Sequence, residues 1–327
     1  MRLSSVTNLL LMVLLLFIET ASVSAVTPNS RLVSLVPPSA EVVAGMNAPS
    51  GDGGPKNFLL ITHNNSMDLD DFIALTGRDP AREIDQVIMV AAEDGRGTFG
   101  EHSLLAIGHF DGALISRSAT GANVSRYRDT PVLVVKPFPR EQAIFNDVRW
   151  LAMIDSSVAV FGTITQVKQE LDRYLSHSAA DPLLMQRLAR LRRDDDTWCV
   201  LARLEYSDKI GSALEILDAK LADFLRDGDS FEFGIHYGRR VEFEYEFNTP
   251  RSVGADAVSR SLVQSLAGRN AAESAQLPAS TVTRSDRVVH GALKVSRARY
   301  DAWIEEVMAR ASLRVATALR DATASPN

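Results

Sequence analysis

Histidines and carboxylates gather in two short stretches of the first half of the chain, and these side chain types bind zinc in proteins. The first stretch holds His63, Asp68, Asp70 and Asp71, and the second holds Glu101, His102, His109 and Asp111. A zinc site needs three or four ligands that converge on one point. The metal-binding candidates are therefore His63, Asp68, Asp71 and His109, and they would support metal-assisted hydrolysis.

The elements expected around these residues favour a simpler interpretation. On a helix, Asp68 and Asp71 share one face. On a strand, a separation of seven residues places His102 and His109 on opposite faces. Acidic residues are also favoured in the first turn of a helix, so the aspartates can serve as helix-start residues without any metal. Both interpretations stay open, and we favour helix capping.

A second candidate surface follows from alternation in the second half of the chain. Glu242, Glu244 and Glu246 alternate with apolar residues, and His236 lies on the preceding apolar run. Such an acidic sheet face could hold a cationic partner or a divalent ion. It could equally be the solvated side of a half-buried sheet, with its like charges offset by Arg239, Arg240 or a neighbouring strand.

The sequence motifs of common hydrolases and nucleotide-binding enzymes are absent. There is no Gly-x-Ser-x-Gly, no His-Glu-x-x-His and no Rossmann fingerprint, and the glycines at 51–54 lack the Lys-Ser/Thr of a phosphate-binding loop. The single cysteine, Cys199, is expected to be a buried apolar residue. We therefore predict no catalytic residue and no cofactor, although a pair of carboxylates acting on a glycoside stays open.

The N-terminus has the parts of a secretory signal peptide. Arg2 precedes an apolar run from Leu9 to Ile18, and small residues lead to Ala25. The run is shorter than the roughly 20 residues that span a bilayer. We expect cleavage after Ala25 and a periplasmic or secreted protein without a transmembrane span, with an uncleaved inner-membrane anchor as the alternative.

The charge balance argues against a nucleic-acid partner. The net charge is −6, and cleavage leaves it unchanged because Arg2 and Glu19 leave together. Nucleic-acid binding depends on a basic surface, which this composition does not provide.

Hydrophobic periodicity predicts alternating strands and helices. In the first half, strands are expected at 40–46, 58–62, 84–92, 103–110, 123–127, 131–137, 148–154 and 158–162, and helices at 68–77, 112–119, 164–177 and 182–193. In the second half, strands are expected at 197–205, 231–237, 241–247, 280–284 and 288–295, and helices at 210–224, 255–266 and 297–319. The charged run 192–196 is expected to be a helix end and an exposed turn.

The hairpin between 231 and 247 has a predictable register. A three-residue turn at 238–240 pairs Tyr237 with Val241 and keeps every apolar residue on one side, whereas a two-residue turn mixes the faces. The hairpin then buries an aromatic face and shows the acidic sheet face to water.

Together these elements predict an α+β fold with two similar halves, each an antiparallel sheet with helices packed on one face. The predicted organisation is a signal peptide at 1–25, an N-terminal segment and linker with a short strand at 26–57, a first half at 58–196, a second half at 197–320 and a disordered tail at 321–327. The shared element order suggests an internal repeat.

Several short stretches carry a resemblance to known proteins. They are Pro-Pro-Ser-Ala at 37–40, Gly-His-Phe-Asp at 108–111, Tyr-Arg-Asp-Thr-Pro at 127–131 and the run 154–163 that leads into a helix. Across most of the mature chain the sequence resembles a loose group of uncharacterised exported bacterial proteins with two α+β halves. The resemblance implies no activity and supplies no catalytic residue.

Two functions from different classes follow. The first is a non-enzymatic binding or envelope-associated module; its partner is unknown, and another envelope protein is one candidate. The alternative is a metal-assisted hydrolase that uses the region of His63 and Asp68. The lack of a recognised catalytic motif favours the first.

Overall fold

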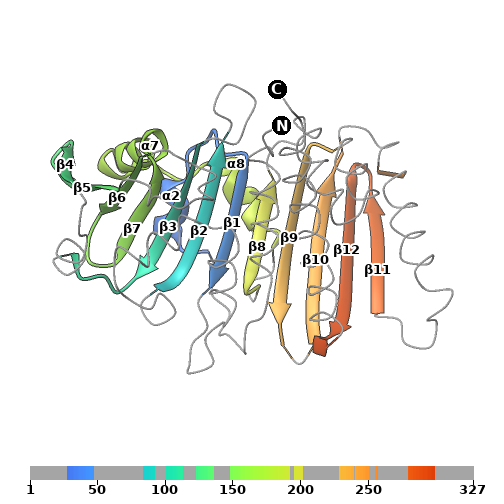
Figure 1. The fold of residues 1–327 in the computed structure, drawn as a ribbon. Helices are drawn as coiled ribbons and strands as arrows, with labels where there is room; N and C mark the ends of the chain where they lie inside the picture. The colour runs from blue at the N-terminus through green and yellow to red at the C-terminus, as the bar shows by residue number, and fades with distance from the viewer. Residues whose placement is uncertain are drawn as a thin grey trace, which may run out of the picture.

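The computed structural model describes residues 28–47, 84–92, 101–112, 123–135, 148–191, 195–201, 228–238, 240–249, 255–256 and 279–298. Its dominant feature is one open antiparallel sheet of twelve strands (Figure 1). On one side lie β1 (Val42–Asn47), β2 (Ile84–Ala92), β3 (Glu101–Gly108), β4 (Asn123–Tyr127), β5 (Thr130–Val135), β6 (Arg149–Met153) and β7 (Val158–Thr163). On the other lie β8 (Thr197–Leu201), β9 (Ser230–Tyr237), β10 (Arg240–Asn248), β11 (Ala279–Ser285) and β12 (Val288–Ser296).

The strand order is β11-β12-β10-β9-β8-β1-β2-β3-β7-β6-β5-β4, so β1 and β8 meet at the centre. This β1–β8 seam pairs Val42 with Leu201 and Met46 with Thr197. The predicted antiparallel strands are confirmed, but the two predicted sheets are a single sheet. The described strands give no evidence of two similar halves, because seven (β1 to β7) lie on one side of the seam and five (β8 to β12) on the other.

All three described helices pack on one face of the sheet, here called the helix face (Figure 1). They are α2 (Ser30–Leu35), α7 (Ile164–Leu175) and α8 (Pro182–Leu188). Thr163 caps α7 and Asp181 caps α8. Their apolar residues share one core with strand residues that include Val43, Ile88, Val90, Leu105, Val160, Trp198 and Val200.

The β1–β8 seam is held on the helix face by a large aromatic side chain. Trp198 is 1% exposed. Its ring lies so close to β1 that a Cβ at Gly45 would meet it at 2.2 Å. Only glycine leaves room for this approach.

A buried carboxyl joins α7 to β3 on the same face. Glu170 is fully buried, and the Ser103 hydroxyl donates a hydrogen bond to its Oε1. Gln166 Nε2 donates to the same oxygen at 3.3 Å. Burial raises the pKa of Glu170 to about 8, although the hydrogen bonds from Ser103 and Gln166 oppose the rise. The carboxyl is therefore mostly protonated at neutral pH.

The register of the β9–β10 hairpin follows the sequence prediction. Tyr237 pairs with Val241, Ile235 with Phe243 and Phe233 with Tyr245. The predicted aromatic face lies opposite the helix face, with centroids of the Phe233 and Phe243 rings 5.5 Å apart. The alternation of apolar and acidic residues therefore fixes this part of the fold.

Other predictions fall partly outside the described residues. These are the signal peptide 1–25, the strand 58–62, the tail 321–327, the helices 68–77 and 210–224, and most of the helices 112–119, 255–266 and 297–319. Helix α2 was not predicted, because its six residues were interpreted as linker. In the described ranges, no helix is long and apolar enough to cross a membrane.

Candidate functional site

Only one of the four metal-binding candidates lies among the described residues. His109 is exposed just after the end of β3, while His63, Asp68 and Asp71 lie outside the described residues. His102 is buried beside Arg149, with 3.4 Å between its Nε2 and the guanidinium. The structure therefore does not bring His102 and His109 together. In the ranges that the structure covers, no three His, Cys, Asp or Glu side chains are grouped as metal ligands.

We expect the purified protein to carry much less than one zinc per chain after dialysis against metal-free buffer. The helix-capping interpretation of Asp68 and Asp71 assigns no ligand role to these residues. Elemental analysis of the wild type and of His63→Ala checks this. One zinc per chain in the wild type, lost in His63→Ala, would show that a metal site exists.

Six polar residues of the described strands and their ends instead form a line across the sheet, here called the polar row. It consists of Gln86 on β2, Asn47 on β1, Asp196 beside β8, His236 on β9, Glu242 on β10 and Lys294 on β12. These residues are cross-strand neighbours on the helix face. Gln86 Nε2 donates to Asn47 Oδ1, and the backbone N–H of Asn47 donates to the Asp196 carbonyl at 3.0 Å. Burial decreases from Asn47 and Asp196, both fully buried, toward Lys294.

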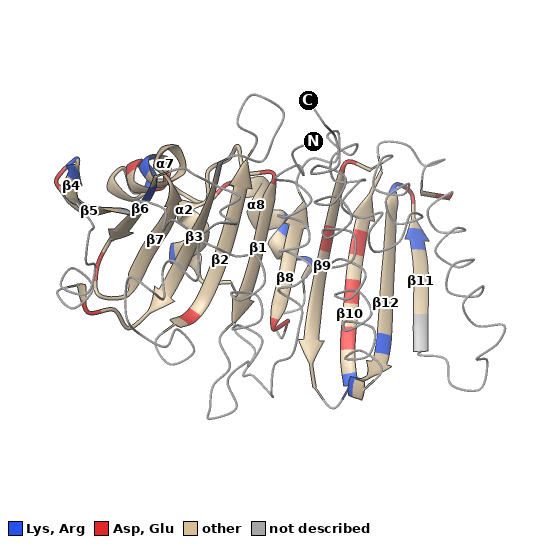
Figure 2. Cartoon of the chain, viewed as in Figure 1, with Lys and Arg blue, Asp and Glu red and all other residues tan. Residues whose placement is uncertain are grey.

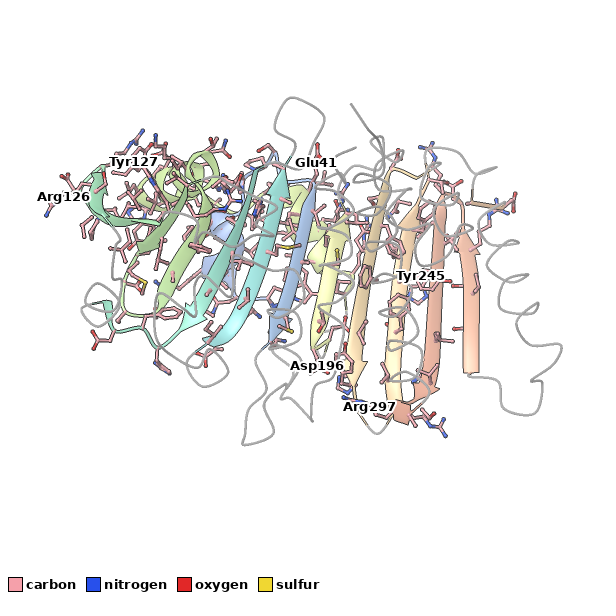
Figure 3. The ribbon with its side chains drawn as sticks, viewed as in Figure 1. Glu41, Arg126, Tyr127, Asp196, Tyr245 and Arg297 are labelled. Atoms are coloured by element: carbon pink, nitrogen blue, oxygen red, sulfur yellow. The ribbon has the colours of Figure 1, made fainter. Side chains whose placement is uncertain are left out.

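The centre of the polar row is a carboxylate–imidazole pair. His236 Nδ1 lies 3.2 Å from Asp196 Oδ2, and the same oxygen accepts the backbone N–H of Tyr237 at 2.6 Å. Figure 3 labels Asp196 at the lower end of β8 and β9. A buried carboxylate beside a histidine fixes the orientation of the imidazole ring. The pair also joins β9 to the β1–β8 seam.

The aspartates before β8 correct a sequence prediction. The run 192–196 was predicted to end in an exposed turn, yet Asp195 is 3% exposed and Asp196 fully buried. The Asp195 carboxylate lies against β9, where a Cβ at Gly234 would meet its Oδ2 at 1.9 Å. The prediction was wrong because partners for these carboxylates come from distant strands. Asp196 is thus a candidate site residue that the sequence did not reveal.

Helix α8 forms an ion pair with a buried glutamate of β9. Arg187 Nε lies 3.4 Å from Oε1 of Glu232, a fully buried residue of β9. Glu232 also accepts hydrogen bonds from Ser230 at 3.0 Å and from Asn248 at 3.0 Å. Burial raises the pKa of Glu232, and the hydrogen bond from Ser230 and the charge of Arg187 limit that rise.

The glutamates predicted to face water are half-buried instead, and two have cationic partners. Arg190 donates to Glu246 at 2.6 Å, and Lys294 Nζ lies 2.8 Å from Glu242 Oε1. Figure 2 shows the acidic positions along β10 and the basic position on neighbouring β12. The prediction that a neighbouring strand offsets the charge is confirmed for Glu242. The acidic sheet face therefore pairs with Arg190, two residues after α8, and with β12, which leaves less of its charge for an external cation.

The lone cysteine is built into the core as expected. Cys199 is fully buried on β8. Burial, and to a smaller extent the charge of Glu232, raise the pKa of its thiol. Because the thiolate is the reactive form, this residue is not poised as a nucleophile.

No protein-family model, curated protein or solved structure matches this chain. The resemblance to exported bacterial proteins therefore stays a prediction, and the function has to be argued from the geometry.

Proposed function

We propose that the protein is an exported, non-enzymatic binding module, associated with the cell envelope, that engages its partner by strand addition at one edge of its sheet. The single observation that carries the proposal is the regularity of β11, the last strand in the described sheet order. An edge strand presents a row of N–H and C=O groups that an added strand can pair with.

Edge strands usually carry features that prevent pairing, such as charges, proline or bulges. Strand β11 pairs with β12 without a register shift over its seven residues. Its central side chains are Thr281, Val282 and Thr283, and both threonines are exposed. The charge at its end, Arg284, forms an ion pair with Asp256. The strand is therefore regular and uncharged at its centre.

The opposite edge is less suited to strand addition. Strand β4 has only five residues, and Arg126 is the fourth of them. Figure 3 shows Arg126 at the far edge of the sheet, on the side away from β11. Directly after β4, Arg128 and Asp129 have positive φ angles of 44° and 67° and form the tight turn into β5. A short strand that carries a cation resists pairing, so this edge serves as an internal control.

Site-specific photo-crosslinking in living cells tests the proposal. A photoreactive residue at Thr283 is expected to give an ultraviolet-dependent adduct of the exported protein, and the same residue at Arg126 is expected to give none. The exposure of both positions makes them comparable. Adducts at Arg126 alone, or at neither position, would contradict binding through β11.

The alternative of a metal-assisted hydrolase at His63 and Asp68 is tested by the zinc measurement above. The described residues give it no added support, because no three His, Cys, Asp or Glu side chains among them are grouped as metal ligands.

A further inference from the structure

We infer that the occupant of the β11 edge is β11 of a second copy, so that the protein forms a homodimer with a sheet continuous across its two-fold axis. This inference rests on the proposed function, because it names the partner at the same edge. A two-fold dimer brings the same surface of both subunits together, so the edge must be complementary to itself.

Strand β11 meets this requirement when two copies pair antiparallel with Val282 opposite Val282. Thr281 then lies opposite Thr283 of the second copy, and Ser280 lies opposite Arg284. Cross-strand Thr–Thr pairs and pairs of β-branched residues stabilise antiparallel sheets. Paired residues also point to the same face in both copies. The threonines extend the helix face, and Val282 extends the face on which its β12 partner Gly291 lies.

The charges at this edge do not oppose the pairing. In the register centred on Val282, the two Arg284 residues lie four residues apart along the strands, which is about 14 Å. That separation exceeds the Debye length of about 8 Å at physiological ionic strength. Each Arg284 also keeps its ion pair with Asp256 of its own chain. No like charges lie directly opposite each other.

The proposed interface is small, which limits the expected affinity of the dimer. One pair of seven-residue strands buries less than the roughly 1,200–2,000 Å² of a stable protein interface. We therefore expect a dissociation constant in the micromolar range, with monomer and dimer in rapid exchange.

Single cysteines test the register in the protein purified from the periplasm. In the proposed pairing, the two Cα atoms at position 282 are about 5 Å apart, within the range that a disulfide bridges. The two Cα atoms at position 283 are about 8 Å apart, beyond that range. Mild oxidation is expected to link Val282→Cys into a covalent dimer and to leave Thr283→Cys largely unlinked. The buried Cys199 thiol does not compete.

Sedimentation velocity gives the independent measurement. Val282→Lys places two ammonium groups directly opposite each other, so its dissociation constant is expected to rise at least about tenfold over the wild type. Val124→Lys, at the exposed opposite edge, is the matched control and is expected to leave dimerisation unchanged.

A wild type that stays monomeric throughout the micromolar range, or equal linking at positions 282 and 283, would overturn the dimer. If the photo-crosslink at Thr283 then joins a different protein, the proposed function stands and only the second copy is excluded. If that crosslink is also missing, both the dimer and the proposed function are excluded.

Discussion

Glu170→Gln is expected to raise the free energy of unfolding at pH 8 by about 1–3 kcal/mol and to flatten its dependence on pH. The reference pKa of a glutamate is 4.5, and burial in the folded protein raises it to about 8. Between these values the folded state keeps a proton that the unfolded state has lost. The stabilising contribution of the protonated carboxyl is therefore complete below pH 4.5 and is lost as the pH rises through about 8.

Glutamine fits the site because it keeps an oxygen that can accept the hydrogen bond from Ser103 and cannot ionise. Glu170 Oε2 has no hydrogen-bond partner among the described residues, so ionisation there is unfavourable. Urea unfolding at several pH values between 5 and 9 measures the effect. Asp85→Asn, at an exposed position of β2, is the control and should leave the pH dependence unchanged. A Glu170→Gln variant that loses stability at pH 8 would show that the carboxyl works as a charged group.

Trp198→Ala is expected to lower the free energy of unfolding by about 3–5 kcal/mol, because it leaves a cavity at the centre of the sheet. The ring is almost fully buried and lies against Gly45 across the β1–β8 seam. Its removal takes away apolar contacts on both strands of the seam. Urea unfolding monitored by circular dichroism provides the measurement.

Trp150→Ala supplies the matched comparison. Trp150 lies on β6, is only half-buried, and its ring is 6.1 Å from Tyr127 and 5.1 Å from the Lys168 ammonium. Loss of this ring is expected to cost about 1–2 kcal/mol, since water can fill part of the space and the cation contact is weak. If Trp150→Ala lowered the free energy of unfolding more than Trp198→Ala, the expectation that the buried ring at the seam contributes more to stability would be contradicted.

Local sequence patterns were sufficient for most of the described strands. Strand β2 spans Ile84–Ala92, as predicted, and β12 extends one residue beyond the prediction. The β9–β10 register could be derived because a shift of one residue would mix apolar and acidic side chains on each face. Hydrophobic periodicity likewise located α7 and α8. These features depend on residues close in the chain.

The arrangement of the strands could not be derived in the same way. Nothing local in residues 42–47 indicates that they pair with residues 197–201, and this pairing converts two expected sheets into one. The same contacts bury Asp196, whose neighbours His236 and Asn47 come from distant strands. The candidate site was therefore predicted in part: His236 and Glu242 follow from alternation, while Asp196, Asn47 and Gln86 depend on the tertiary fold.

The central position of β1 has a consequence for how the chain is made. Val42 pairs with Leu201, so the two strands of the seam are 159 residues apart in sequence (201 − 42). Because the chain is synthesised from its N-terminus, β1 can pair with β2 early. The other edge of β1 stays unpaired until β8 has been synthesised. Contacts between residues so far apart in sequence form slowly, and until they form the unpaired apolar strand favours aggregation. A pause in translation before residue 197 would therefore leave the chain most prone to aggregation.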